Sequence, residues 1–388
     1  MNIKLSYNYA RFNRHAFHSR GCLLSYSCLM KYRIGFFLLK ALIFSACGIS
    51  GVVTYECGEP VFVQDFPVQV DLPSSSPVEG DFMGAVVLYG SDSVFAAMTP
   101  GTDNFLKLYS SDFGTPRAEM WHKGDGPDEF SYPPSIVGFD SRDGVTSITA
   151  YYRPDASLHF WKVSGEGEIL SHVEKAVTDS MGSVKQVVEL GDSSYLLVSH
   201  AYETGCFYRY ILKDNIVSLV PNMGRQYERL PDIDCNLISF IPYASPDGTK
   251  MVEGHISLDQ INLYSLRDTT FRKTIVVGSR LDNLLELGGI FGKDVPYTYS
   301  FGQTFDDCFV MLYHGLDKGD YYSGKGTSQL RFFSWNGEPL LRINVPLVAV
   351  SFHIDSIGNL YLFTPFGETE NVYKYDISST LDNLHKEF

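Results

Sequence analysis

Acidic residues are missing from the start of this 388-residue chain: no Asp or Glu precedes Glu56, so all 45 acidic residues follow it. Seven of the 31 basic residues lie before Cys47, which leaves 24 basic against 45 acidic residues after it, a net charge of −21. A basic, acid-free leader before an acidic body is typical of a targeting segment. The acidic body argues against nucleic-acid binding, which depends on clustered Lys and Arg.

A long hydrophobic run is also missing. The most apolar stretch, residues 34–46, is only 13 residues long and contains Lys40, whereas a membrane-spanning helix needs about 20 apolar residues. Read from Met30, "MKYRIGFFLLKALIFSAC" has a charged start, a short apolar stretch and small residues before the cysteine. These are the three parts of a secretory signal, and they suggest that translation starts at Met30. The alternative is an uncleaved N-terminal segment buried in the fold.

With Cys47 directly after Ser45-Ala46, the leader resembles a bacterial lipoprotein signal, although Phe44 stands where Leu is usual and Lys40 interrupts the apolar stretch. The resemblance implies that Cys47 carries the lipid anchor and that the membrane is a partner through it. Residues 48–51 contain no acidic cluster, which favours the outer membrane with the protein facing the periplasm. We therefore expect a leader over 1–46, a tether over 47–58 and a folded body over 59–388.

Metal-type cysteine pairs are absent. The body holds Cys57, Cys206, Cys235 and Cys308, and none forms a CxxC motif. Cys206 and Cys308 lie inside apolar strand patterns and are expected to be small buried residues. Disulfide pairing among the four stays open.

Helical periodicity is nearly absent, and residues 281–292 are the one stretch where a short helix is expected. Instead, short strand-like runs recur with turn clusters 50 to 60 residues apart, at 90–93, 141–144, 191–194, 245–248, 305–307 and 355–359. Six repeats of a four-stranded unit predict an all-β fold, a six-bladed β-propeller with antiparallel blades. The sixth unit lacks a clear fourth strand, so we expect residues 60–70 to supply it and close the ring. A β-sandwich is the alternative, but sandwiches lack such a period.

The sequence "GDGPDEF" (124–130) lies between the first two repeats. It resembles the Gly-x-Gly-Pro-Gly-Glu-Phe connection of six-bladed propellers of the TolB-like and NHL-like type, and the leader is similar to that of Bacteroidetes lipoproteins with such a propeller. Asp128 replaces the third glycine. We expect a structural turn in which Gly124 and Gly126 adopt angles closed to other residues, Pro127 fixes the next one, and Phe130 fills the gap between blades. The resemblance implies fold and location but no defined reaction.

Long connections are not evenly distributed. If the strands of each blade are labelled A to D from the channel outwards, the long segments 114–134, 222–235, 278–296 and 315–329 all lie on the face formed by the B–C and D–A connections. Loops elaborated on one face of a repeat scaffold are typical of a binding surface. These segments and the strand ends beside them carry Tyr, Trp and Arg, which dominate interface hot spots. The candidate ligand-binding residues are Trp121, Arg153, Arg225, Tyr227, Arg229, Tyr321 and Tyr322.

These features favour a non-catalytic, membrane-anchored propeller that binds a protein, peptide or glycan, with no cofactor and no catalytic residue. The alternative is a metal-dependent lactonase- or lyase-like enzyme with a site at the channel mouth. Its candidate metal ligands are His200, His255 and His314, which occupy equivalent strand-B ends in three successive repeats. No Ser-His-Asp arrangement or nucleophile motif accompanies them.

Overall fold

The computed structural model describes residues 51–126, 129–177, 183–230, 233–367 and 369–387. The leader and Cys47 therefore lie outside the described residues, as do Pro127 and Asp128. Residues Val52–Phe388 form one compact unit. Because Tyr55 and Cys57 are buried in it, the folded body begins at Val52 and not at residue 59 as expected.

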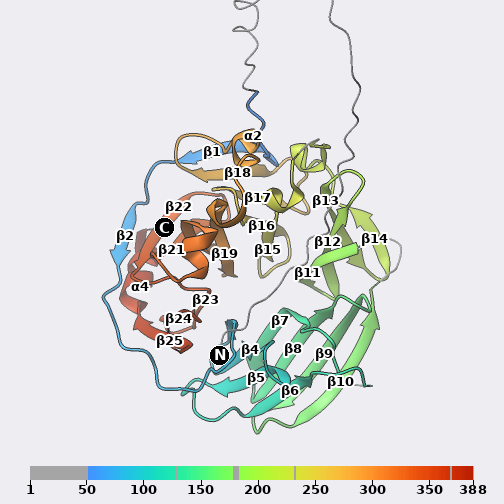
Figure 1. The fold of residues 1–388 in the computed structure, drawn as a ribbon, viewed down its shortest axis with the longest axis vertical. Coiled ribbons are helices and arrows are strands. Elements are labelled where there is room, and N and C mark those ends of the chain that lie inside the picture. Colours follow the sequence, from blue (N-terminus) through green and yellow to red (C-terminus); the bar gives the residue numbers. More distant parts are fainter. Residues whose placement is uncertain (1–50, 127–128, 178–182, 231–232, 368, 388) are drawn as a thin grey trace, which may run out of the picture. The chain divides into compact units, whose positions relative to one another are not determined.

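Six small sheets are arranged around a central channel as the blades of a propeller (Figure 1), which confirms the predicted fold. Blades 1 to 3 each have four antiparallel strands in chain order: β3 (Val87–Gly90), β4 (Val94–Met98), β5 (Asn104–Ser110) and β6 (Ala118–His122); β7 (Ser135–Arg142), β8 (Val145–Tyr152), β9 (Ser157–Ser164) and β10 (Ile169–Ala176); and β11 (Ser183–Gly191), β12 (Ser194–Ala201), β13 (Cys206–Lys213) and β14 (Ile216–Leu219).

Blades 4 and 5 have the same antiparallel order, and blade 6 has three described strands. Their bounds are β15 (Phe240–Ala244), β16 (Lys250–His255), β17 (Ile261–Ser265) and β18 (Arg272–Val277); β19 (Pro296–Thr304), β20 (Cys308–Asp317), β21 (Ser328–Ser334) and β22 (Pro339–Val345); and β23 (Ser351–Ile354), β24 (Asn359–Thr364) and β25 (Asn371–Asp376).

Tight turns join the A and B strands where the turn clusters predict them. In blade 2, Arg142 pairs with Val145 across Asp143 and Gly144, whose φ angles are 52° and 74°. Two successive residues at positive φ form the two-residue hairpin turn whose twist matches the strands, and Asp-Gly is a favoured sequence for it.

The N-terminal segment does not complete blade 6, which corrects the expected ring closure. Strand β1 (Glu59–Val63) pairs in parallel with β18, and β2 (Val68–Asp71) pairs in parallel with β22, so blades 4 and 5 each gain a fifth strand on their outer edge (Figure 1). Between the two strands, Phe66 is buried against Phe333 of blade 5. Burial of this ring holds the segment at the junction of blades 4 and 5.

Blade 6 meets blade 1 through side chains. Phe95 and Phe113 of blade 1 pack against Tyr361 of blade 6, and Leu88 N donates to Ser351 Oγ at 3.0 Å. The incoming chain contributes one backbone contact, Val78 N to Val372 O at 2.7 Å. A packed aromatic cluster therefore closes the ring where a shared sheet was expected.

Helical segments are short and most lie in the connections: η2 (Gly224–Tyr227), η3 (Cys235–Ile238), α2 (Leu284–Leu287), η4 (Gly292–Asp294), α3 (Lys318–Tyr322) and α4 (Ser378–Glu387). The expected helix in 281–292 is present as α2, whereas α3 and α4 were not predicted. Within the described part of the chain, no helix is long and apolar enough to cross a membrane.

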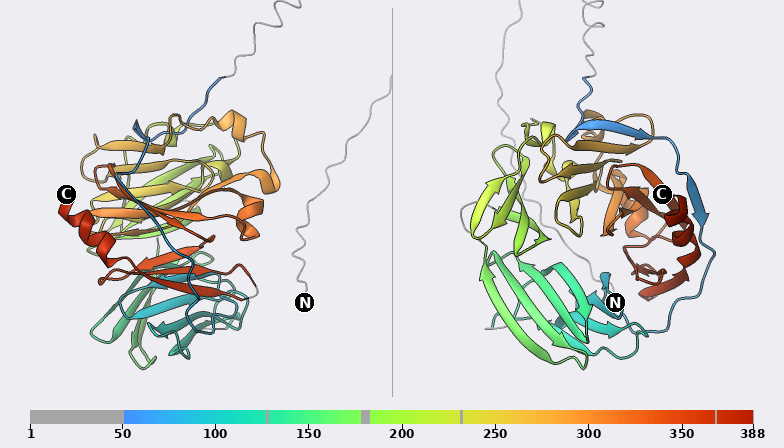
Figure 2. Two further views of the ribbon diagram at one scale, coloured as in Figure 1. Left: turned by 90° about the vertical axis from the view of Figure 1, so that its left-hand side faces the viewer. Right: turned by 180° about the vertical axis from the view of Figure 1, so that it is seen from behind.

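The longer connections share one face of the ring, as predicted, except that the first predicted segment is shorter than expected, because residues 118–122 form β6 and only 123–134 connect blades 1 and 2. We call the face formed by the B–C and D–A connections the loop face. α2, α3 and the three 3₁₀ segments follow D or B strands and so belong to it. Helix α4 follows a C strand and belongs to the opposite face. Figure 2 shows this division, with the orange connections on one side of the ring and the red C-terminal helix on the other.

All four body cysteines are free thiols, and Cys57, Cys206 and Cys308 are buried. The prediction that Cys206 and Cys308 are small buried residues is confirmed. The described residues contain no disulfide; packing, hydrogen bonds and ion pairs hold the described blades together.

Candidate functional site

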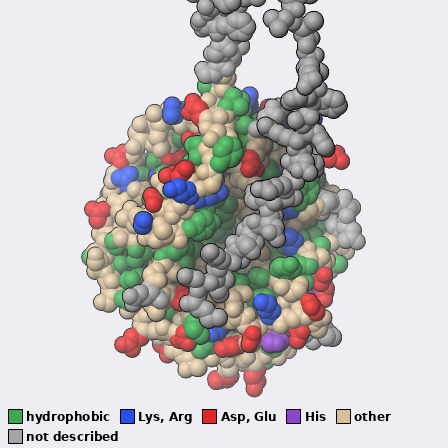
Figure 3. Space-filling model, viewed as in Figure 1, with side chains coloured by type: hydrophobic (Ala, Val, Ile, Leu, Met, Phe, Trp, Pro, Cys, Tyr) green, Lys and Arg blue, Asp and Glu red, His purple; other side chains and the backbone are tan. Residues whose placement is uncertain are grey.

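The central channel is a candidate site, with a volume of about 790 Å³. The innermost strand of every blade contributes to its wall, and one residue from each is Tyr89, Ile136, Val187, Tyr243, Phe301 and His353. This volume lies within the range of small-molecule and peptide-side-chain pockets. The space-filling view of the loop face shows hydrophobic side chains interspersed with charged side chains of both signs (Figure 3).

Two cations lie at the loop-face end of the channel. Arg153 directly follows β8, and Lys185 is near the start of β11 in the next blade. Arg153 Nη2 donates to the backbone oxygen of Lys185 at 3.0 Å, and Lys185 Nζ donates to Tyr202 Oη at 2.7 Å. Neither cation forms an ion pair with a described carboxylate. The channel mouth therefore offers two positive groups with donors to spare on an otherwise acidic body.

Two nearby groups have shifted pKa values, for different reasons. The hydrogen bond from Lys185 lowers the pKa of the exposed Tyr202 phenol. Further along the same strand, Glu189 lines the channel, and the surrounding protein raises the pKa of its carboxyl by desolvation even though the side chain remains accessible. The channel thus has cations at the loop face and one carboxylate deeper inside.

Aromatic rings form the wall near Phe301. Its ring lies 5.7 Å from that of Tyr89, 6.2 Å from that of Tyr243 and 5.8 Å from that of Phe352. Burial raises the pKa of Tyr89 to about 12, so this phenol is neutral at physiological pH. Such a wall suits apolar or ring-shaped groups.

The predicted ligand-binding residues fall into two groups. Arg153, Arg229 and Tyr322 are exposed on the loop face. Arg225 and Tyr227 are partly buried and engaged: Arg225 Nη1 donates to Thr54 O at 3.3 Å, and Tyr227 Oη donates to Val220 O at 2.9 Å. These two residues hold the chain in place.

Trp121 and Tyr321 are buried, which corrects the expectation that they are exposed. Trp121 packs between blades 1 and 2, with its ring centroid 5.2 Å from that of Trp161 and 6.4 Å from that of Phe130. Tyr321 stacks on Tyr297 at 3.9 Å. Large aromatic side chains in or beside a connection can fold inward, where they exclude more water than they would at the surface.

In the motif at 124–130, Phe130 packs as predicted, but the reason for the two glycines differs from the prediction. Phe130 is buried and contacts Tyr152 of blade 2 at 5.0 Å between ring centroids, so it fills the gap as expected. Gly124 and Gly126 do not adopt positive φ. Instead, Gly126 N donates to the Glu129 carboxylate at 2.8 Å, and a Cβ on either glycine would collide with that carboxylate.

The histidines do not converge on a metal site. His314 contacts Ser300 Oγ at 2.7 Å and Ser328 Oγ at 2.9 Å, and His255 Nε2 contacts Asn262 Nδ2 at 2.9 Å. His200 packs against Phe207 and Tyr202 of its own blade. Burial lowers the pKa of both His255 and His314 to about 3. No described group of three His, Cys, Asp or Glu side chains could hold a metal ion, so the hypothesis of a three-histidine site is not supported.

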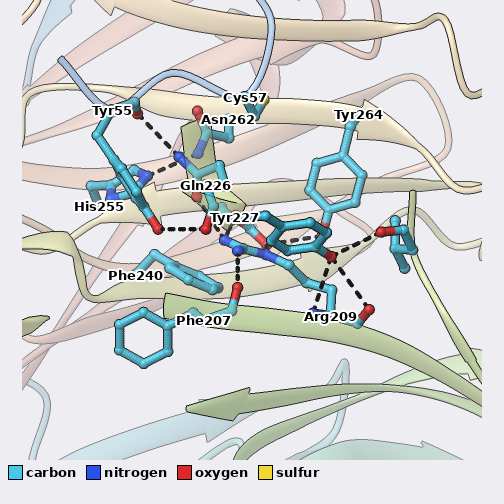
Figure 4. Close-up of polar contacts among 12 residues, drawn as sticks. Tyr55, Cys57, Phe207, Arg209, Gln226, Tyr227, Phe240, His255, Asn262 and Tyr264 are labelled. Atoms are coloured by element: carbon cyan, nitrogen blue, oxygen red, sulfur yellow. Dashed lines mark hydrogen bonds and ion pairs between the residues drawn. The ribbon is translucent and has the colours of Figure 1, made fainter. Parts of the chain in front are cut away.

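Sequence reasoning missed a polar cluster between blades 3 and 4 (Figure 4). Arg209 and Glu253 are both fully buried and form a bidentate ion pair, with Nε–Oε1 at 2.9 Å and Nη2–Oε2 at 2.7 Å. Tyr264 Oη donates to the same carboxylate at 2.8 Å, and Gln226 accepts from Arg209. Gln226 Nε2 in turn donates to Tyr55 O at 3.0 Å, which ties the N-terminal segment to the ring.

Sequence reasoning also missed Lys185 and Tyr202. Their positions along the strands could have indicated them. Lys185 is the third residue of an A strand and Tyr202 directly follows a B strand. Both residues therefore belong to the loop-face end of the ring, near Arg153.

No protein-family profile matches the chain, and none of the curated proteins compared with it matches. Similar solved structures include a candidate exported protein from Bacteroides fragilis, with 10% identity, 79% of this chain and 88% of that chain covered, and a TM-score of 0.43. A protein of unknown function from Bacteroides caccae has 12% identity, 67% and 83% coverage and a TM-score of 0.35. The propeller domain of the trilobed protease from Pyrococcus furiosus has 10% identity, 76% and 82% coverage and a TM-score of 0.36.

Proposed function

We propose that this protein is a lipid-anchored, non-catalytic propeller of the bacterial cell envelope that binds a protein, peptide or glycan at the channel mouth on its loop face. The supporting observation is the pair of cations, Arg153 and Lys185, that line a channel of about 790 Å³ without an ion-pair partner among the described residues. Exposed aromatic side chains, Tyr132, Tyr202 and Tyr322, lie in connections of the same face. Together they favour a ligand that carries acidic groups.

The anchoring part of the proposal depends on the leader. Cys47 follows a signal-like segment, and a processed lipoprotein cysteine carries several acyl chains, enough for stable membrane attachment. The absence of acids over 48–51 favours an outer-membrane protein that faces the periplasm. The TolB-like lipoprotein resemblance of the "GDGPDEF" segment and leader agrees with this location.

Binding can be tested with matched charge-removal variants. Arg153→Gln/Lys185→Gln removes both cations at the channel mouth, whereas Arg142→Gln/Lys213→Gln removes two exposed cations from the turns of the opposite face. Full-length protein would be titrated against immobilised acidic and neutral peptides and against uronic-acid and neutral polysaccharides. We expect the first variant to bind the acidic ligand at least about tenfold more weakly, or about 1.4 kcal/mol, with the second unchanged. Equal binding by both variants would show that the ligand does not bind at the channel mouth.

A further inference from the structure

The N-terminal segment leaves the ring on the loop face. Val53 N donates to Asn283 Oδ1 at 3.1 Å, and Leu284 N donates back to Val53 O at 2.8 Å. Arg225 holds Thr54 from the neighbouring connection, and Tyr55 is buried. Val52 therefore lies beside α2, at the rim of the loop face over blade 4.

Exposed apolar side chains surround this point. Val52 is 69% exposed, Leu285 on α2 49%, Phe291 77% and Tyr322 on α3 65%. The elements that carry them are adjacent, because Val53 pairs with α2, and α3 packs against η4, which directly follows Phe291. We call these four residues the exit patch. Exposed apolar side chains gathered on adjacent elements, unlike single ones, are typical of a contact surface.

Charged side chains of both signs border the exit patch. Lys293 and Lys325 are exposed beside it, and so are Asp294 and Asp320. Long lysine side chains beside apolar tips suit a membrane interface, where the ammonium reaches the headgroups while the stem stays in the apolar layer. Glu286, next to Leu285 on α2, is exposed as well, so these charges give no net positive patch and the apolar side chains must provide most of the attraction.

The length of chain before Val52 sets the distance from the proposed anchor. Cys47 precedes Val52 by five residues, and a fully extended chain covers at most about 3.6 Å per residue, or roughly 18 Å in all. A lipid on Cys47 thus keeps Val52 within roughly 18 Å of the bilayer surface. A longer tether, as the sequence suggested, would have left the ring free to turn.

We propose that the exit patch docks on the lipid bilayer, with Phe291, Leu285 and Tyr322 in the interfacial layer and the loop face turned towards the membrane. The proposal rests on the lipid anchor in the proposed function, and it adds an orientation: the channel mouth faces the membrane side. A ligand of the channel mouth then belongs to the membrane surface or to a protein close to it. The opposite face points away from the bilayer.

The orientation can be measured with two tryptophan variants of the full-length, lipidated protein in phosphatidylcholine vesicles. Phe291→Trp places the reporter in the exit patch, and Ile357→Trp places it in a turn of the opposite face, where Ile357 is 74% exposed. The native Trp121, Trp161 and Trp335 are buried and give the same background in both variants. Lipids brominated in their acyl chains quench a tryptophan that enters the interface.

We expect fractional quenching of the added reporter to be at least about threefold larger at position 291 than at position 357, because only the exit patch enters the interface. Adding Leu285→Ser/Tyr322→Ser to Phe291→Trp should reduce that quenching while the protein still sediments with vesicles. This separates docking from simple tethering.

Equal quenching at the two positions in sedimenting protein overturns the docking proposal and leaves the anchor intact. So does an emission shift at position 291 that depends on protein concentration and not on brominated lipid, because that result assigns the exit patch to a second copy of the chain. Failure of the wild-type protein to sediment is a different result, since it removes the lipid anchor on which the proposed function depends.

Discussion

Trp121 lies in a strand that leads into a long connection, yet its side chain is part of the core. It is the last but one residue of β6 and has a φ of 60°, an uncommon value for a non-glycine residue. That backbone conformation coincides with burial of the indole beside Trp161 and Phe130. Trp121 is therefore a core residue and not the exposed ligand-binding residue that its residue type suggested.

Trp121→Ala is therefore expected to destabilise the protein by about 3–5 kcal/mol, because it leaves a cavity between blades 1 and 2. Tyr322→Ala removes an exposed aromatic side chain and should change the free energy of unfolding by less than about 0.5 kcal/mol. Urea denaturation of the two variants compares them. A fully stable Trp121→Ala protein would contradict the burial of this side chain.

His314 should make stability depend on pH. Its folded pKa is lowered to about 3 by burial, while the unfolded value is about 6.5. Above about pH 6.5 both states are neutral and stability does not change. As the pH falls from there towards 3, the unfolded state takes up a proton that the folded state does not, so stability is lost at up to about 1.4 kcal/mol per pH unit.

The His314→Asn variant tests this dependence. It should lose less stability than wild type between pH 7.5 and 5.5, by about 1.4 kcal/mol, whatever its absolute stability. Urea midpoints at pH 7.5, 6.5 and 5.5 give the comparison. A wild-type slope retained in the variant would show that His314 does not remain neutral in the fold.

One buried ion pair joins strands that lie far apart in the sequence. Arg209 of β13 and Glu253 of β16 are both 0% exposed, and Arg209 also lies over the Phe240 ring at 4.3 Å. Gln226 of η2 links the pair to Tyr55. Blades 3 and 4 and the N-terminal segment therefore meet at one hydrogen-bonded point.

Glu253→Gln should cost about 3–5 kcal/mol, because it leaves the Arg209 charge buried without its counter-charge. The control is Asp140→Asn, which breaks the exposed Arg142–Asp140 pair and should cost no more than about 1 kcal/mol. Thermal or urea unfolding distinguishes them. Equal effects of the two changes would mean that water reaches the Arg209–Glu253 pair.

The outer strands β1 and β2 pass around blades 4 and 5 before the chain enters blade 1. The N-terminal segment is thus fixed to the ring at Tyr55, along β1 and along β2. A pull on the proposed anchor would be transmitted to the blades and not to a loose tether.

Lipidation itself is tested by acyl labelling. In cells fed a labelled fatty acid, the wild-type protein should carry label and the Cys47→Ser variant should carry none, because Cys47 is the proposed acceptor. Cys235→Ser is the matched control, since this body cysteine is a half-buried free thiol. An unlabelled wild type, or a labelled Cys47→Ser variant, would refute the anchor.

The local sequence pattern was enough to predict much of the fold of this protein. Alternating strands and regularly spaced turns were enough to predict six blades, the position of the tight turns and the face with the long connections, because strand period and turn chemistry depend on neighbouring residues. The role of Phe130 as a filler between blades also followed from its motif. The leader points to an anchor for the same reason.

Three features could not be predicted from local pattern: which edges the N-terminal strands join, which aromatic side chains are buried, and how Arg153 meets Lys185 at the channel mouth. These features depend on contacts between distant residues, such as Tyr55 Oη with Gln226 O, which are 171 positions apart. An alternating strand fits any open edge equally well, and a loop tyrosine or tryptophan can point inward or outward. Its choice depends on the apolar area that neighbouring blades offer, and that area exists only once the ring has formed.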